Sequence, residues 1–300
     1  MGQVWVAGEV LIDLIPEGAD RKPIVGGGPA NTAKALSKLG IDTQFIDGIS
    51  TDRYGQMAKN KLVTAGVKLD YVKYSDKPTC LAIVSLSDSG SATYEFVIEN
   101  TATFDFTSEW LPNPQTGRPS ILHIGTLATI IEPGASVLFD WAQSVAKVVP
   151  IVFDPNIRPA VISDQKQYVA QVERWVAISS AVKISDDDIN WLYPSLDIEQ
   201  VVNNWLKNGP SLIVVTYGDK GLTGYRKGEM VRADSVKVKV ADTVGAGDTV
   251  GAVLVEAIVK DGLASLTGSR LESTLKRAAK AAGITVSRVG ANPPTSEELE

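Results

Sequence analysis

Strand-like and helix-like segments alternate along most of the chain. Residues 3–15 are apolar in the manner of a strand, and residues 29–39 carry apolar side chains along one helical face until Gly40 ends the helix. A strand at 43–50 and a helix at 52–66 follow. This βαβα order predicts an α/β fold.

The alternation is interrupted between about residues 68 and 98. Three strand-like segments, 67–74, 78–86 and 91–99, follow one another without a helix, and the turn Ser87–Gly90 joins the last two. We predict a small antiparallel sheet here, as an appendage of the main domain. Its role is either to cover a ligand or to form a stabilising flap or oligomer contact.

The alternation then resumes. Four segments rich in Val and Ile are separated by helical patterns and are typical of strands buried on both faces of a parallel sheet. They occupy residues 120–125, 150–156, 181–185 and 211–218. Short strands are expected within 222–239, and helices from 245 onward. Since no repeat or low-complexity linker divides the chain, we expect one domain over residues 1–300.

The charge balance limits the classes of ligand. The chain has 29 Lys and Arg against 35 Asp and Glu, a formal charge of -6, and 44% hydrophobic residues. This composition is typical of a globular domain, and its acidic balance argues against duplex nucleic acid as a partner. A phosphate-bearing ligand would therefore need a local site that attracts anions.

Several features favour a cytoplasmic location. The apolar N-terminal stretch is interrupted by Glu9 and Asp13 and has no basic leader, which is atypical of a secretory signal. No apolar run of about 18 residues exists, so no membrane span or membrane partner is expected. The single cysteine, Cys80, cannot form an intrachain disulfide, and with the lone His123 it cannot build a zinc site.

The densest chemical signal is the segment Asp242–Asp248, Asp-Thr-Val-Gly-Ala-Gly-Asp, between a strand and a helix. Small residues at 245–247 let the backbone approach a ligand, and the free N–H groups and dipole of a helix start bind anions. Asp248 falls in the first helical turn, where a carboxylate could take a proton from a hydroxyl group. The alternative is a glycine-rich turn whose acidic residue only stabilises the helix dipole.

A second glycine segment, Gly26–Asn31, also opens a helix. Asn31 carries donor and acceptor groups, and Asp13, at the end of the first strand, could accept hydrogen bonds from a polyol. Both could lie at the ligand-binding edge of a parallel sheet, although an Asp in this position is often a turn former. The chain has no GxxxxGK[ST] motif and no complete GxGxxG after the first strand, which argues against a P-loop or a dinucleotide fold.

Gly26–Asn31 and Asp242–Asp248, in this order, resemble the paired signatures of the ribokinase-like (PfkB) carbohydrate kinases. The resemblance spans nearly the whole chain, including residues 214–221 and 284–295, and the segment Asp154–Pro159 is most similar to bacterial fructokinases. It implies a ribokinase-like, three-layer α/β/α fold with a mostly parallel central sheet and a small β-sheet lid.

In this family the lid would be formed mainly by about 68–98 plus part of 10–25, and a homodimer could form through it. The resemblance also implies a site. Asp248 would be the general base, and the amides of Gly245, Ala246 and Gly247 would form an anion hole for the γ-phosphate. Arg158 would lie near the sugar and the transferring phosphate.

The resemblance implies binding roles for further residues. The sugar hydroxyls would be held by Asp13, Gly27, Gly28, Asn31, Arg158 and Asp248. The nucleotide would be bound by Thr216, Gly218, Gly221, Lys183 and Ser185.

Two positions bear on metal ions. Ser185 and Asp188 stand where many relatives have Asn-x-x-Glu, a pair tied to Mg²⁺ and phosphate, so Asp188 is the candidate for magnesium. Ser185 could instead simply cap a helix. Asp242 is the candidate for a potassium ion, together with main-chain carbonyls near Val244, Thr285 and Gly290.

Other conspicuous side chains have core interpretations. His123, on an expected buried strand, is interpreted as a hydrogen-bonded core residue rather than a catalyst. The aromatic side chains in or after the lid could pack on the sugar or only on each other; they are Tyr94, Phe96 and Phe104.

Together these features predict a sugar kinase that uses ATP with Mg²⁺, and K⁺ as a further candidate, and that converts fructose to fructose 6-phosphate. Within the same family, 2-dehydro-3-deoxygluconate kinase, ribokinase and nucleoside kinase are the alternatives. From other classes, a non-catalytic sugar or nucleotide sensor and a dehydrogenase remain. The intact Asp248 counts against the sensor, and the missing dinucleotide fingerprint counts against the dehydrogenase.

Overall fold

The computed structural model describes residues 2–18, 20–86 and 92–300. Its main sheet has eight strands in the order β14-β13-β12-β11-β10-β9-β1-β4. The pairs from β12 to β4 are parallel, whereas β13 and β14 run antiparallel at one edge. In chain order the strands are β1 (Val4–Ala7), β4 (Thr43–Ile46), β9 (Ile121–Gly125), β10 (Ile151–Asp154), β11 (Ala181–Ser185), β12 (Leu212–Thr216), β13 (Leu222–Arg226) and β14 (Glu229–Ala233).

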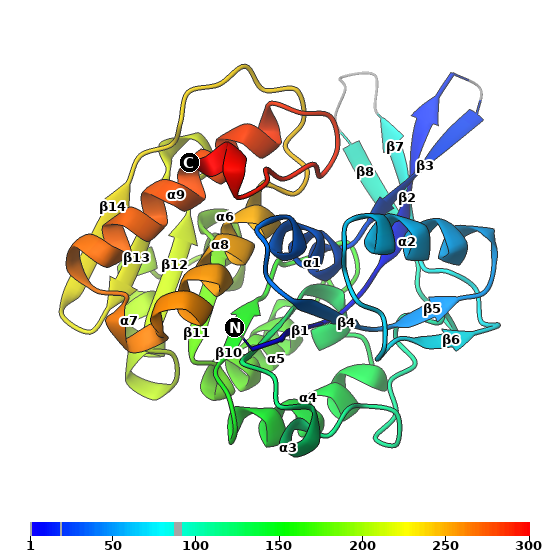
Figure 1. The fold of residues 1–300 in the computed structure, drawn as a ribbon, viewed down its shortest axis with the longest axis horizontal. Coiled ribbons are helices and arrows are strands. Elements are labelled where there is room, and N and C mark those ends of the chain that lie inside the picture. The colour runs from blue at the N-terminus through cyan, green and yellow to red at the C-terminus, as the bar shows by residue number, and fades with distance from the viewer. Residues whose placement is uncertain (1, 19, 87–91) are drawn as a thin grey trace.

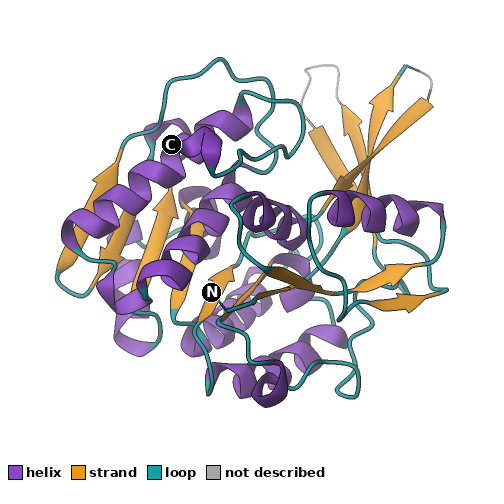
Figure 2. Ribbon diagram, in the orientation of Figure 1, coloured by secondary structure: helices purple, strands orange, loops and turns teal. Residues whose placement is uncertain are grey.

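Helices cover both faces of this sheet (Figure 2). One layer holds α1 (Gly28–Lys38), α8 (Ala246–Asp261) and α9 (Gly268–Val286), with α2 (Arg53–Thr64) beside α1. The opposite layer holds α4 (Gly134–Ala146), α5 (Gln165–Ile178), α6 (Asp186–Leu192) and α7 (Ile198–Asn208), and α3 (Pro114–Gly117) is a short helix before β9. The three-layer α/β/α arrangement with a mostly parallel central sheet is therefore confirmed.

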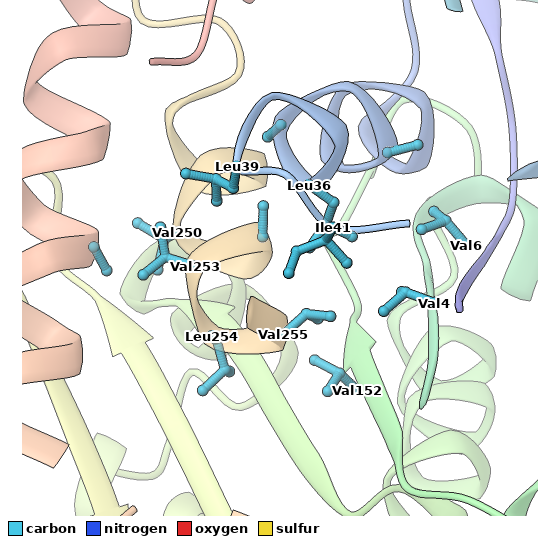
Figure 3. Close-up of a cluster of buried hydrophobic side chains, with 14 of the residues drawn as sticks. Val4, Val6, Leu36, Leu39, Ile41, Val152, Val250, Val253, Leu254 and Val255 are labelled. Carbon is cyan, nitrogen blue, oxygen red and sulfur yellow. The ribbon is translucent and has the colours of Figure 1, made fainter. Parts of the chain in front are cut away.

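Alternating side chains of the buried strands fill two separate cores. Val4 and Val6 of β1 join the core under α1 and α8, whereas Trp5 and Ala7 join the core on the other face. Figure 3 shows the first core, in which side chains of α8 approach those of α1 above the sheet. Both helices begin at the same edge of the sheet (Figure 1). Because α1 and α8 also pack against each other, their first turns lie side by side.

A second, four-stranded sheet projects from this body (Figure 1), with the order β3-β2-β7-β8. Its strands are β2 (Leu11–Glu17), β3 (Asp20–Gly26), β7 (Leu81–Leu86) and β8 (Ala92–Val97). The neighbours β2 and β7 are parallel, so this sheet is mixed rather than wholly antiparallel as expected. The expected turn at Ser87–Gly90 lies outside the described residues.

Three strand boundaries differ from expectation. The single strand expected at 43–50 is divided into β4, in the main sheet, and β5 (Gly48–Ser50), in a separate two-stranded sheet. The single strand expected at 3–15 is divided between the two sheets, because the chain bends at Gly8, where a Cβ atom would lie 2.4 Å from Cγ of Pro29. The segment 67–74 does not join the projecting sheet. It is hydrogen-bonded beside β4, and β6 (Lys73–Ser75) pairs with β5 (Gly48–Ser50) in a separate sheet.

The short 3₁₀ helices are η1 (Thr126–Thr129), η2 (Gly218–Lys220), η3 (Leu263–Ser265) and η4 (Glu297–Leu299). Among the described residues, none of the helices combines the length and the apolar character that a membrane crossing requires.

Candidate active site

A cavity of about 540 Å³ lies where the carboxyl ends of the central strands meet the first turns of α1 and α8. This is the edge at which parallel α/β sheets usually bind ligands. Residues of both glycine segments, of the projecting sheet and of the strand ends line it. The expected site residues among them are Asp13, Gly27, Gly28, Asn31, Arg158, Lys183, Gly245, Gly247 and Asp248.

The start of α8 is open toward this cavity. Gly245, with φ of 82°, is the N-cap, and no side chain caps the helix. Among the described residues, no acceptor is found for the N–H groups of Gly247 and Asp248. Unpaired N–H groups at the positive end of a helix of this length form a site for an anion. Of the residues expected to form the anion site, Gly247 has an N–H group that is free within the described part of the chain, whereas the N–H of Ala246 donates to the carbonyl oxygen of Thr243 at 3.4 Å.

Asp248, in the first turn of α8, is buried beside this site. Its Oδ2 accepts a hydrogen bond from Nδ2 of Asn31 at 2.9 Å. Burial raises the pKa of the Asp248 carboxyl to about 6, and nearby Lys183 and Arg158 oppose that rise. A carboxyl with such a pKa is largely ionised near neutral pH and can still accept a proton efficiently.

A buried ion pair lies beneath the same helix start. Nζ of Lys183 lies 2.9 Å from Oδ2 of Asp154, and both side chains are almost fully buried. Burial lowers the pKa of Lys183, but Asp154 and Asp248 outweigh it, so the net direction is upward and the side chain is a cation. A Cβ atom at Gly247 would lie 2.8 Å from Nζ of Lys183, so any larger residue there would displace the ammonium group.

Asp13 and Arg158 also line the cavity. Burial raises the pKa of the Asp13 carboxyl to about 6, and the charge of Arg158 limits this rise. The Arg158 guanidinium donates to the carbonyl oxygens of Asn156 and Ile157, at 3.2 and 3.0 Å. The arginine is therefore held at the cavity by the loop that follows β10.

Three residues of this region were not singled out by sequence reasoning. Glu9 lines the cavity, and burial raises the pKa of its carboxyl to about 7. Asn156 also lines it, and Thr126 lies behind it; both have left-handed backbones, with φ of 43° and 58°. An acidic residue inside an apolar strand segment was the available signal for Glu9, whereas backbone strain at Thr126 has no sequence signature.

Ser185 and Asp188 form a capping box at the start of α6. Oγ of Ser185 accepts from the N–H of Asp188 at 3.0 Å, and one carboxylate oxygen of Asp188 accepts from the N–H of Ser185. The other oxygen accepts from the N–H of Ile157 at 3.0 Å. Neither residue lines the cavity. Both oxygens of Asp188 thus hold the backbone, and within the described ranges no group of three acidic, His or Cys side chains could hold a metal ion.

Asp242 ties two loops together. One of its oxygens accepts from the N–H of Val244 at 3.0 Å, and the other accepts from the N–H of Gly290 at 2.8 Å. The loop that carries Gly245 is thereby joined to the loop that follows α9.

The expected nucleotide residues other than Lys183 lie outside the cavity. Thr216 ends β12 and pairs in register with Ser185 of β11, so it lies one strand further along the same sheet edge. Gly218 and Gly221 follow it, and at Gly221 a Cβ atom would lie 2.2 Å from the carbonyl oxygen of Ala233. This glycine is therefore required by the turn itself, with or without a ligand.

His123 and the aromatic residues have mixed outcomes. His123 is buried and burial lowers its pKa to about 3, so it is neutral. The expectation of a hydrogen-bonded histidine is wrong: neither ring nitrogen has a partner among the described residues. Tyr94 and Phe96 line the cavity, whereas Phe104 belongs to the core.

A larger hollow of about 760 Å³ lies between β8 and the body. It shares Tyr94, Phe96 and Ala160 with the first cavity but contains no residue of either glycine segment. We therefore assign the chemistry to the smaller cavity, where the open helix start and the buried carboxylate converge.

Comparisons with known proteins cover nearly the whole chain. The family model described as "pfkB family carbohydrate kinase" matches residues 1–298. A fructokinase of Rhizobium leguminosarum bv. trifolii is 35% identical over 265 residues, which is 87% of this chain and 81% of the relative. A fructokinase of Salmonella typhimurium is 29% identical over 96% of this chain and 94% of the relative.

Among solved structures, the fructokinase of Xylella fastidiosa with bound ATP superposes with a TM-score of 0.92 at 23% identity, covering 99% of this chain and 96% of that one. A fructokinase double mutant of Vibrio cholerae O395, bound to fructose, ADP and a potassium ion, gives 0.87 at 24% identity, covering 100% and 97%. At these identities the likeness establishes the fold, and the fold is ribokinase-like.

Proposed function

Because this chain belongs to the pfkB family of carbohydrate kinases, we propose that it transfers the γ-phosphate of ATP to a primary hydroxyl of fructose, giving fructose 6-phosphate. The observation that carries the proposal is the position of the buried Asp248 carboxylate in the open first turn of α8. A hydroxyl group and a phosphate can meet there. The similarity to curated fructokinases favours fructose over other sugars.

In the proposed reaction, Asp248 accepts the proton of the sugar hydroxyl while the oxygen of that hydroxyl forms a bond to the γ-phosphorus. The bond between that phosphorus and the bridging oxygen breaks, and ADP leaves. The N–H groups of Gly245, Ala246 and Gly247 and the guanidinium of Arg158 stabilise the transferring charge. No covalent enzyme intermediate is needed, because the catalytic groups act by position and charge.

The sugar hydroxyls would be held by Asp13 and Asn31. The backbone at Gly27 and Gly28 would contact the sugar ring. On the nucleotide side we assign Thr216, Gly218, Gly221, Lys183 and Ser185. Lys183 is the only one of these five in the cavity, and its position beside Gly247 supports a phosphate contact. The other four would be reached by the nucleoside, which extends along the sheet edge.

Magnesium would enter as MgATP, the substrate. Mg²⁺ usually keeps several waters and substrate phosphates as ligands, so one carboxylate of this chain is enough. Asp188 fits that limited role only weakly, because both of its oxygens already accept backbone hydrogen bonds. For potassium, Asp242 would act by ordering the loop and its carbonyls, since its oxygens are likewise engaged.

We further propose that the projecting sheet of β3, β2, β7 and β8 is the lid expected from about 68–98 and part of 10–25, and that it excludes water from the cavity. Val84, Tyr94 and Phe96 of this sheet already line the cavity. Tyr94 and Val97 of the edge strand β8 are exposed, which supports a homodimer through the lid. Sedimentation of the wild-type protein and of Val97→Glu tests this; a wild-type monomer would contradict it.

A cytoplasmic location is part of the proposal, because Cys80 is a free, buried thiol and a cytoplasmic kinase has access to ATP. Fractionation of the native cells with an antibody to this chain tests it. Recovery in the secreted fraction would contradict it.

The activity is tested by coupled ADP release with fructose, ribose, 2-dehydro-3-deoxygluconate and adenosine, each with and without potassium. We expect the highest kcat/KM with fructose and a 6-phosphate product by NMR. A higher kcat/KM with another acceptor would replace fructose within the same family. No ADP release with any acceptor, with sugar binding retained, would establish a sensor instead.

A further inference from the structure

Thr126 has a backbone that its residue type rarely adopts. Its φ of 58° lies in the left-handed region, where β-branched residues are true outliers, and its side chain is buried. It directly follows β9 and begins the 3₁₀ helix η1. Strained residues of this kind persist only where surrounding contacts fix them, and they concentrate at functional sites.

Glu9 supplies those contacts. Its carboxylate accepts a hydrogen bond from the hydroxyl of Thr126, and Oε2 accepts another from the N–H of Ala128 at 3.2 Å. Glu9 follows β1 and Thr126 follows β9, which are neighbouring parallel strands. Because Glu9 is itself only 2% exposed, the two hydrogen bonds join the ends of two central strands inside the protein.

The Thr126 turn in turn touches the reaction site. A Cβ atom at Gly28 would lie 2.7 Å from Cγ2 of Thr126 and 3.4 Å from Oδ1 of Asp248, so the methyl group of Thr126 packs directly against the backbone of Gly28. Gly28 begins α1, and Asn31 in the same first turn is the hydrogen-bond partner of Asp248. A shift of the turn would therefore move the sugar-facing wall of the cavity.

We propose that Glu9 is a positioning residue for the sugar: it holds the Thr126 turn in its strained conformation, and the turn sets the place of the α1 start beside Asp248. This proposal rests on the sugar kinase function proposed above. Glu9, Gly28 and Leu127 line the cavity next to the expected sugar ligands, whereas four of the five assigned nucleotide residues lie outside it and the fifth, Lys183, is held by Asp154. Loss of the Glu9 contact thus acts on the sugar and spares the nucleotide.

Steady-state kinetics of four variants test the proposal. In Glu9→Gln an amide group replaces one acceptor oxygen, and in Thr126→Val the hydroxyl donor is lost at constant shape. We expect both to raise KM for fructose at least about tenfold, with KM for ATP within about twofold. Thr126→Ser keeps the hydroxyl for Glu9 but loses the methyl group that packs on Gly28, so its KM for fructose should lie between those of wild type and Thr126→Val.

Thr43→Val is the matched control, because Thr43 is also buried and, within the described part of the chain, the carbonyl of Ile41 at 2.9 Å is the one partner of its hydroxyl. This variant should leave both KM values unchanged, and any effect should be confined to the melting temperature. Equal changes in both KM values, or a lower melting temperature with unchanged KM for fructose, would overturn the positioning role. So would a Thr126→Ser variant as impaired as Thr126→Val.

Should Glu9→Gln fail to fold, the isosteric Thr126→Val decides the question alone. A wild-type protein that phosphorylates no sugar would refute the proposed function instead. An active wild type with an unchanged KM for fructose in the folded variants refutes only the role of Glu9.

Discussion

Asn31 donates a hydrogen bond through Nδ2 to Oδ2 of Asp248 at 2.9 Å, although the two residues are separated by 217 positions in the chain. The bond joins the first turns of α1 and α8, whose side chains share one core (Figure 3). Oδ1 of Asn31 is buried and has no partner among the described residues. An unpaired acceptor of this kind is costly unless a ligand donates to it, and a sugar hydroxyl would do so.

Removal of the Asp248 carboxylate tests the general base. Asp248→Asn keeps the shape of the side chain and one acceptor oxygen for Asn31 but cannot accept the proton, so kcat should fall at least about 10²-fold. ADP release at saturating fructose and ATP measures it. The matched control is Asp261→Asn, at the exposed last turn of the same helix, which should turn over at the wild-type rate. Near-normal kcat in folded Asp248→Asn would remove this mechanism.

The rate should depend on pH with a single acid limb. The proton acceptor must be ionised, and burial raises the pKa of Asp248 to about 6, so kcat/KM should fall about tenfold per pH unit below pH 6 and level off above it. Asp13 has a pKa of about 6 as well. Its variant Asp13→Asn should lose sugar affinity yet keep the acid limb in kcat. Loss of the limb in this variant would assign it to Asp13 and contradict Asp248 as its source.

The pKa of Glu9 should make stability depend on pH in the opposite direction. Its pKa of about 7 in the folded protein exceeds its ordinary value of 4.5, so between these pH values the folded chain binds more protons than the unfolded chain. The free energy of unfolding should therefore fall as pH rises from 4.5 to 7. Urea unfolding at pH 5 and pH 8 measures this difference, which should be smaller in Glu9→Gln; an equal difference in both proteins would contradict it.

Two Gly→Ala variants on α8 should differ in activity. A Cβ atom at Gly247 would lie 2.8 Å from Nζ of Lys183, so Gly247→Ala should lower kcat/KM for ATP at least about tenfold. At Gly251 the new atom would lie 3.6 Å from Nε2 of His123, an ordinary contact. Gly251→Ala should keep its activity and gain about 0.5–1 kcal/mol of helix stability. Equal activities of the two variants would refute the role of the helix start.

The buried ion pair should matter more for stability than an exposed one. Lys183→Met leaves Asp154 as a buried, uncompensated carboxylate, which should cost about 3–5 kcal/mol in chemical unfolding. Lys68→Met removes an exposed partner of Asp42 and should cost less than about 1 kcal/mol. A double variant, Lys183→Met with Asp154→Asn, should recover part of the loss. Similar costs for Lys183→Met and Lys68→Met would contradict the buried pair.

Local patterns in the sequence were sufficient for much of the fold. The Val and Ile runs predicted buried parallel strands, and Gly26–Asn31 and Asp242–Asp248 predicted two helix starts, one of which carries Asp248 in its first turn. These features depend on residues within one or two turns of each other, through side-chain periodicity and the backbone freedom of glycine. They can therefore be predicted from a single sequence.

The remaining features depend on contacts between distant segments. Residues 3–15 form two strands, which are separated at Gly8, where the backbone lies close to the Pro29 side chain. Backbone hydrogen bonds place the start of segment 67–74 beside β4. The burial of Glu9, its bond to Thr126, and the capping of α6 by Ser185 likewise required the packed structure. The sequence determined which side chains were available for the chemistry; only tertiary packing decided which became buried and paired, because desolvation and hydrogen bonding act on atoms that are neighbours in space.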